Sequence, residues 1–352
     1  MSQTTGRVAP QVAPAVAGAS RRRILTVVVL VVLLAAFSLL SIVLGSRVVG
    51  LEGIARGVSA AFGGEIAEGF DAAAVQKRVP RTVLALVAGA ALGMSGAVMQ
   101  GVTRNPLADP GILGVNMGAS LAIVVGMAWF GLSSAAGHVW VAIVGAAVTA
   151  LLVYAIASLG GGATPLKLAL AGAAASAALA SFISAVVLPR TDIAGNVRDW
   201  QIGGVGGGSW AQLGLVLPFL IAGFAICLFS ARSLNLLALG DDLAAGLGQR
   251  VAIARAAGAL GAVVLCGSVT AVTGPIGFVG LVVPHACRLL AGVDHRWLLP
   301  LSAAAGAILL TVADIAGRVV APPAEIAVGI ITSFIGAPVF IWIVRRRKVR
   351  EL

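Results

Sequence analysis

Charge is scarce in this sequence of 352 residues. Only 11% of the residues are charged and 59% are hydrophobic, with a mean hydropathy of +1.05, whereas soluble domains carry about 25% charge. Aromatic residues make up 5%, while glycine is abundant at 46 residues. Small residues let membrane helices approach closely. The composition therefore predicts an all-α, polytopic membrane bundle, and the short alternating segments of a membrane β-barrel are missing.

Motifs that would mark an enzyme are also missing. The sequence contains no HExxH, CxxC or Ser–His–Asp arrangement, and no GxxxxGK[ST] loop that would hold a nucleotide phosphate. Cysteine occurs three times, at Cys227, Cys266 and Cys287, each within an apolar run, which is typical of packing residues. We therefore expect no catalytic residue, no metal site and no cofactor bound by this chain.

Positive charge is clustered at the ends of the apolar spans. The net charge is +11, and the clearest clusters are "RRR" at 21–23 and "RRRKVR" at 345–350. Basic residues flanking apolar spans set the orientation of a membrane protein. We therefore expect membrane lipid around this chain and no nucleic-acid partner.

Ten apolar runs are candidate membrane-spanning helices, beginning with an uncleaved first helix at 24–44. The others are 79–101, 111–130, 139–159, 166–188, 211–230, 251–273, 276–292, 298–319 and 326–344. An even number of spans places both termini on one side. Of the 24 Lys and Arg residues, eight fall opposite the termini: Arg47, Arg56, Lys77, Arg78, Arg81, Arg190, Arg198 and Arg318. Since the side richer in Lys and Arg is cytoplasmic, both termini should be cytoplasmic.

The chain then divides into a disordered cytoplasmic tail at 1–20, a membrane domain at 21–345 and a basic cytoplasmic tail at 346–352. Two long outer loops are expected at 45–78, with a short surface helix, and at 189–210. Small residues recur every fourth position in two spans, at Ala85, Gly89, Gly93, Ala97 and Gly101 and at Ala254, Gly258, Ala262, Cys266 and Thr270. The offset of five spans would make a five-plus-five inverted repeat, which many transporters contain.

Two segments combine helix breakers with apolar residues. One is "GPIGFVGLVVPH" at 274–285, with two prolines and three glycines, and the other is "TRNPLADPGILG" at 103–114. Proline and glycine destabilise helices, and irregular backbone within a membrane persists only when it is buried in protein or lines a cavity. A tight connection with ordinary turn chemistry is an alternative for the 103–114 segment.

The longest internal cytoplasmic loop is "SLNLLALGDDLAAGLGQR" at 233–250. Its leucines form one short apolar block, Gly240 breaks it, and Asp241 or Asp242 can cap a second short helix. An exposed apolar patch indicates a binding partner. The alternative is a helical hairpin folded onto its own bundle.

Titratable residues are almost absent from the spans. Asp314 is the only acidic residue within an apolar span, and Arg318 lies four residues later, on the same helix face. An ion-driven secondary transporter, the main alternative from another class, would need an intramembrane titratable or cation site. We find none, so energy for transport would come from another chain.

The long motifs resemble those of the FecCD/BtuC-type permeases, the membrane subunits of ABC importers for iron–siderophore complexes, haem and cobalamin. The resemblance rests on "RVPRTVLALVAGAALGMSGAVMQGVTRNPLADPGILGVNMGAS" (78–120), "LNLLALGDDLAAGLG" (234–248), "GPIGFVGLVVPHACRLLAGVDHRWLLPLSAAAGAILLTVADIAGR" (274–318) and "PAEIAVGIITSFIGAPVFIWIV" (323–344). It implies ten helices in a bacterial inner-membrane subunit that pairs with a second, identical or paralogous permease. It also implies two cytoplasmic ATPase subunits, which bind ATP and Mg²⁺, and an extracytoplasmic substrate-binding protein.

The resemblance also implies roles for particular residues. The segment 233–250 would couple to the ATPase through Leu234, Leu236, Leu237, Leu239, Gly240, Asp241, Asp242, Gly246 and Gly248. Arg78, Arg81 and Arg318 would dock the binding protein, and snorkelling at the interface is their alternative role. The translocation path would include Asn105, Pro110, Gly114, Pro275, Gly277, Gly280 and Pro284. "GILGVNMGAS" and "WQIGGVGGGSW" are most similar to ferric-siderophore permeases, with haem and cobalamin as alternative cargoes.

Overall fold

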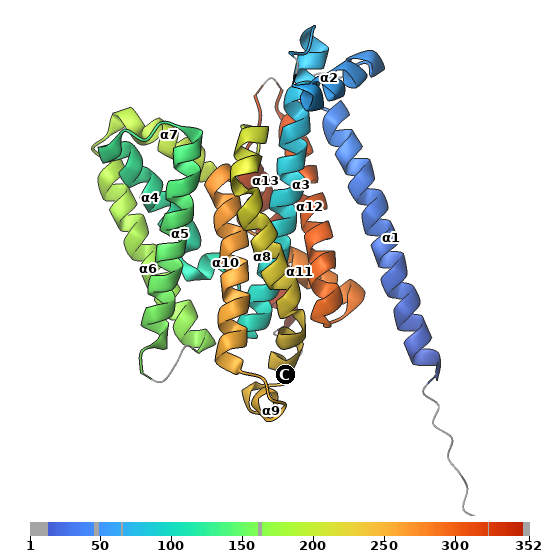
Figure 1. The fold of residues 1–352 in the computed structure, drawn as a ribbon, viewed down its shortest axis with the longest axis vertical. Coiled ribbons are helices and arrows are strands. Elements are labelled where there is room, and N and C mark those ends of the chain that lie inside the picture. Colours follow the sequence, from blue (N-terminus) through green and yellow to red (C-terminus); the bar gives the residue numbers. More distant parts are fainter. Residues whose placement is uncertain (1–12, 46–48, 65, 161–163, 323, 348–352) are drawn as a thin grey trace, which may run out of the picture.

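A computed structural model describes residues 13–45, 49–64, 66–160, 164–322 and 324–347. Within these residues the chain is all-helical and contains no strand. Most of the long helices run side by side along one axis, as Figure 1 shows. The predicted all-α bundle is confirmed.

Seven helices are long and apolar enough to cross a bilayer, which requires about 20 residues. They are α1 (Ala13–Val43), α3 (Phe70–Thr103), α5 (Ala135–Ser158), α6 (Pro165–Val187), α8 (Trp210–Leu237), α10 (Val251–Thr273) and α12 (His295–Val320). In α1 the apolar part is Arg23–Val43. Residues 13–20 of the expected disordered tail are helical, and residues 1–12 lie outside the described residues.

Three further predicted spans correspond to shorter apolar helices: α4 (Val115–Phe130), α11 (Val279–Ala291) and α13 (Val328–Arg347). Each predicted span therefore falls on a helix. With 13 residues, however, α11 is about 20 Å long, less than the roughly 30 Å of a hydrocarbon core. It begins inside the bundle, since its first residues, Val279 and Gly280, are buried, and the five residues before it are not helical.

Short elements lie at the two ends of the bundle. At one end, here the α2 end, are α2 (Leu51–Gly63) and α7 (Thr191–Ile202), and at the other, the α9 end, is α9 (Asp241–Gly246). The short helix expected in 45–78 is thus present as α2. The glycine-rich composition of 189–210 did not indicate α7.

Close backbone contacts explain the small-residue stripe of α3. A Cβ at Gly93 would lie 3.3 Å from the Cα of Gly306, and one at Gly89 would lie 2.9 Å from the Cα of Ala307. Such contacts hold α3 against α12 without bulky side chains. The second stripe, in α10, is buried too. Helix packing accounts for the burial of both stripes.

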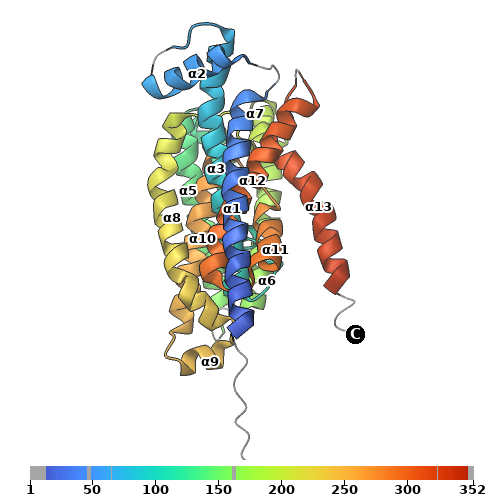
Figure 2. The same ribbon diagram turned by 90° about the vertical axis from the view of Figure 1, so that its right-hand side faces the viewer.

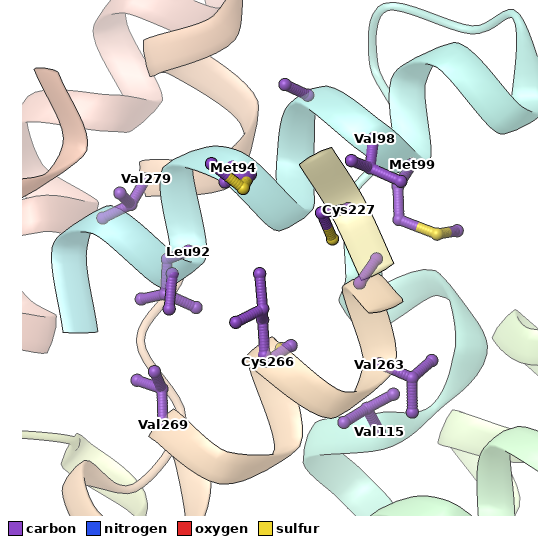
Figure 3. Packing of buried hydrophobic residues seen from close by; sticks show 14 of the residues in the cluster. Leu92, Met94, Val98, Met99, Val115, Cys227, Val263, Cys266, Val269 and Val279 are labelled. Carbon is purple, nitrogen blue, oxygen red and sulfur yellow. The ribbon is translucent and has the colours of Figure 1, made fainter. Parts of the chain in front are cut away.

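The core is centred on α3 and α10. Figure 3 shows Leu92, Met94 and Val98 of α3 near Cys266 and Val269 of α10. Cys227, Cys266 and Cys287 are all buried and free, as expected of packing residues. By contrast, α1 lies on the outside of the bundle, and α13 diverges from it toward its C-terminal end (Figure 2). Most of the apolar part of α1 is exposed.

Candidate coupling and translocation sites

The connection between α8 and α10, residues 238–250, carries α9 at the tip of the bundle. Glycine sets its shape: Gly240 has φ 108° and Gly248 has φ 83°, values that L side chains rarely adopt. Asp241 opens α9 and pairs with Arg255 at 2.9 Å and with Arg104 at 3.2 Å. The fold of this connection is thus fixed by two glycines and by ion pairs to α10 and to the end of α3.

The leucines of this connection face two ways. Leu234 and Leu237 are fully buried in the core and Leu236 is half-buried, whereas Leu239 is exposed. The exposed apolar surface also includes Leu243 and Leu247, each 63% exposed. The predicted apolar block of four leucines is therefore not one surface. We call Leu239, Leu243 and Leu247 the leucine patch.

Other residues assigned to coupling surround this patch. Asp242 and Gly246 are exposed, and a Cβ at Gly246 or Gly248 would meet no other atom within 4 Å. The conformation therefore leaves room for a partner above these glycines. Sequence reasoning missed Leu243 and Leu247, although their i, i+4 spacing placed them on one helix face.

A break separates α10 from α11, as the proline and glycine content of 274–285 predicted. The carbonyl of Thr273 accepts a 2.7 Å hydrogen bond from the amide of Gly204. Gly274 has φ 69° and packs its backbone against the carbonyl of Trp200, at the end of α7. Phe278, also in the left-handed region at φ 66°, precedes the first residue of α11. Backbone groups freed by the break are thus partly satisfied by the segment after α7.

Pro284 does not mark this break, because it lies inside α11. A proline cannot donate to the carbonyl four residues earlier, which here belongs to Gly280. Instead, Nε2 of Gln100 on α3 donates to Gly280 O at 3.1 Å, and Oε1 of Gln100 accepts from Arg288 at 2.5 Å. Pro284 therefore creates an attachment between α11 and α3. Of the residues assigned to the break, Pro275 and Gly277 do lie in it.

Gly280 is a point of close approach. Its backbone lies against Gly96 of α3, and a Cβ at Gly280 would come within 2.9 Å of Oδ2 of Asp109. Asp109 itself caps the 3-10 helix η1 (Pro110–Leu113) by accepting from the amide of Gly111 at 2.8 Å. The two breaker-rich segments, 103–114 and 274–285, therefore meet. Gln100 and Asp109 were not assigned from the sequence.

The other assigned path residues lie in the 103–114 segment. Asn105 is exposed and its Oδ1 accepts from the amide of Leu107 at 3.0 Å, which is ordinary turn chemistry. Pro110 is buried at the start of η1, and Gly114 ends it with φ 72° beside Thr149 of α5. The η1 end of this segment is buried whereas Asn105 is exposed, so the tight-turn interpretation fits Asn105.

Near the α2 end, Asp314 holds two arginines. Its Oδ1 lies 2.7 Å from Nη2 of Arg81, and its Oδ2 lies 2.9 Å from Nη2 of Arg318. Glu325, which is 41% exposed, pairs with Arg81 at 2.6 Å. The predicted pairing of Asp314 with Arg318 along one helix is confirmed. The carboxylate is shared with a second helix, since Arg81 belongs to α3.

Arg78 and Arg318 also bind the C-terminal end of α1. Arg318 donates to the carbonyls of Ser41 (2.9 Å) and Leu44 (2.8 Å), and Arg78 donates to that of Val43 (2.9 Å). The last carbonyls of a helix lack partners within it and carry partial negative charge. Both guanidinium groups therefore attach α1 to the bundle. Arg318 is only 1% exposed, so a docking role leaves it little surface, whereas Arg81 keeps an exposed edge.

A multi-helical membrane bundle with an internally broken helix and an exposed apolar patch at one tip is the architecture of a transport subunit. The family model of the FecCD transport family matches residues 32–346, and this chain belongs to that family. The ferric enterobactin transport system permease protein FepD of Escherichia coli is 50% identical over 272 residues, covering 77% of this chain and 81% of FepD.

Other relatives agree in sequence and in fold. YfiZ of Bacillus subtilis, a protein assigned to siderophore transport as a permease, is 44% identical over 270 residues, which cover 76% of this chain and 81% of YfiZ. A solved inward-facing ABC transporter assigned to the metal-chelate type is 27% identical, with a TM-score of 0.79, covering 92% of this chain and 99% of that one.

Proposed function

We propose that this chain is the permease subunit of an ATP-driven importer of ferric siderophores. The observation that carries the proposal is the 50% identity with the ferric enterobactin permease over 77% of the chain. Further relatives are named for hydroxamate and citrate complexes of iron. Chelated ferric iron is the cargo these systems have in common, and a catecholate siderophore is the first to test.

The assembly that we propose contains a second permease, identical or paralogous, two ATPase subunits and a substrate-binding protein. The leucine patch would enter the ATPase, because these three leucines at the tip of the bundle are exposed, with no covering surface in the described part of the chain. ATP and Mg²⁺ would bind to the ATPase subunits. The binding protein would select the cargo and deliver it at the opposite end.

In this proposal the bundle crosses the inner membrane ten times, and both termini and the α9 end are cytoplasmic. The 13 residues of α11 complete a crossing together with the non-helical segment 274–278, which would border the cargo path beside Gly280. The five-plus-five inverted relation of the two halves remains part of the proposal. The excess of Lys and Arg on the side of the termini supports the orientation.

The test is uptake by the reconstituted transporter. Vesicles containing the permease and its ATPase, supplied with binding protein, should accumulate labelled ferric enterobactin when ATP is inside, and uptake should persist when an ionophore abolishes the proton gradient. Labelled haem and cobalamin serve as competing cargoes. Uptake of either in preference to ferric enterobactin would refute the cargo, and uptake by the permease alone under an ion gradient would refute the ATP-driven mechanism.

A further inference from the structure

A hydrogen-bonded cluster at the α9 end joins α8 to α12. Asn235 lies in the last turn of α8, and its Oδ1 accepts from the backbone amide of His295 at 2.9 Å and lies 2.8 Å from Nδ1 of the same residue. Its Nδ2 donates to Oδ1 of Asp294 at 2.7 Å. Because an amide oxygen can only accept, the His295 ring carries its proton on Nδ1. One amide thus makes three hydrogen bonds to the start of α12.

Asp294 is at the same time the N-cap of α12. Its Oδ1 accepts from the amide of Arg296 at 3.0 Å, so the residue that stabilises the first turn of α12 is also the residue that Asn235 binds. A displacement of the end of α8 therefore acts directly on the start of α12.

The imidazole of His295 carries the contact to a third helix. His295 is buried, and a Cβ at Gly101, in the last turn of α3, would lie 2.7 Å from its Nε2. A side chain at position 101 would displace the ring, so the glycine allows α3 to end on this cluster. Asn235, Asp294, His295 and Gly101 are hereafter the α8–α12 joint.

Contacts continue from this joint to the break before α11. Gln100, the neighbour of Gly101, donates to the carbonyl of Gly280 in the first turn of α11. Further along, α3 and α12 are in backbone contact at Gly93 and Gly306. The end of α8, which leads into α9, is therefore connected to the broken helix through two helices that are packed without intervening side chains.

We propose that Asn235 is the positioning residue that passes a displacement of α9 to α12 and α3, and through Gln100 to α11. This inference rests on the proposed function, because it concerns how ATP hydrolysis in a partner would reach the cargo path. Asn235 lies between Leu234 and Leu237, both fully buried. An apolar residue there would pack as well, but only a hydrogen-bonding side chain fixes the position of one helix end relative to another.

The test exchanges donor and acceptor within the pair. In the reconstituted full transporter, the ratio of ferric enterobactin imported to ATP hydrolysed is measured for four variants. Asn235→Asp places two carboxylates side by side, and we expect the ratio to fall about tenfold, the factor that corresponds to one or two buried hydrogen bonds. Asp294→Asn keeps an oxygen for the Asn235 amide and should stay near the wild-type ratio.

The double variant Asn235→Asp/Asp294→Asn restores a donor–acceptor pair of opposite direction, and Asn is as good an N-cap as Asp. We expect its ratio to return to within about twofold of wild type, which is a small fraction of the tenfold step. The matched control is Ser230→Ala, because Ser230 is buried in α8 and, among the described residues, its hydroxyl bonds within that helix, to the carbonyl of Ile226. This control should not change the ratio.

Two results would overturn the inference: wild-type coupling in Asn235→Asp, or a double variant that is as impaired as Asn235→Asp. Asn235→Asp complexes that do not assemble would leave the decision to the double variant, which must then assemble and couple. A wild-type complex that shows no ATP-dependent uptake of ferric enterobactin, haem or cobalamin would instead refute the proposed function.

Discussion

The two ends of the bundle differ in whether the side chains described above are paired within the chain or exposed. Near the α2 end, Arg81 and Arg318 share the buried carboxylate of Asp314, and the remaining donors of Arg318 bind the end of α1. At the α9 end, the leucine patch of Leu239, Leu243 and Leu247 faces away from the protein. One cluster of charged groups is thus paired within the chain near the α2 end, and one cluster of three leucines is left exposed at the α9 end.

This difference separates structural from partner-binding residues. A buried charge must be paired where it lies, since an unpaired one carries a large desolvation penalty. An exposed leucine contributes little to folding and gains stability when a partner covers it. Substitutions near the α2 end should therefore affect the stability of the subunit, and substitutions in the leucine patch should affect assembly.

The largest effect is expected from Asp314→Ala. It removes the buried carboxylate that pairs with both Arg81 and Arg318. Removing one member of a buried pair costs about 3–5 kcal/mol, and we expect a loss of stability of that size. Thermal unfolding of the detergent-purified protein measures the loss. The matched variant is Glu325→Ala, which removes the half-exposed partner of Arg81 and should cost less than about 1 kcal/mol. Equal losses would contradict a buried Asp314.

The next largest effect distinguishes a buried leucine of α8 from an exposed leucine of the leucine patch. Leu237→Ala removes a fully buried side chain and should destabilise the subunit by roughly 2–4 kcal/mol, whereas Leu243→Arg should change stability by no more than about 0.5 kcal/mol. Copurification of the ATPase should show the opposite order, with loss in Leu243→Arg. A Leu243→Arg subunit that retains the ATPase would exclude the leucine patch as the contact.

A smaller effect should distinguish two roles of Arg78: attachment of α1 to the bundle, and docking of the binding protein. Arg78→Met keeps the apolar stem but removes the hydrogen bonds to the carbonyls of Ile42 and Val43, which should cost about 1–2 kcal/mol. Affinity for the binding protein, measured on the same sample, should stay unchanged. Unchanged stability with lost affinity would favour docking, the role that the family resemblance implied.

Much of the fold could be predicted from the sequence, because apolar length and helix breakers are local properties. Every predicted span contains a helix, and the break at 274–278 lies where the first proline and glycines are. Contacts between distant residues could not be predicted in this way. The sequence suggested that Pro284 belongs to the break, but its effect is to free the Gly280 carbonyl for Gln100, 180 residues away.

The candidate sites follow the same division. Pairing of Asp314 with Arg318 is an i, i+4 contact and was predictable, whereas the contact of Arg81 with Asp314 joins α3 to α12. Leu234 and Leu239 look alike in the sequence, but Leu234 is buried within α8 and Leu239 is exposed in the turn after it. Asn235 was passed over because its partners begin 59 residues later.

The smallest expected effect is the change of stability at acidic pH, compared between Asp294 of the α8–α12 joint and a carboxylate elsewhere at the α9 end. Burial raises the pKa of the Asp294 carboxyl. Hydrogen bonds from Asn235 and the Arg296 amide, together with the charges of Arg296 and Arg23, outweigh that effect, so that the pKa lies below its ordinary value of 3.8. A carboxylate whose pKa is depressed by folding stabilises the protein above the unfolded-state pKa, and that stabilisation is lost as the pH falls through the folded-state value.

We would measure unfolding between about pH 6 and about pH 3, which includes the ordinary pKa of Asp. The wild-type protein should lose a little stability at the acid end of this range, and the Asp294→Asn variant should lose less. The matched control is Asp242→Asn, because Asp242 is exposed on α9 and makes no ion pair among the described residues. If Asp294→Asn and wild type lose stability in parallel, Asp294 is not held by Asn235 in solution, and the joint between α8 and α12 has only the His295 contacts to transmit a displacement.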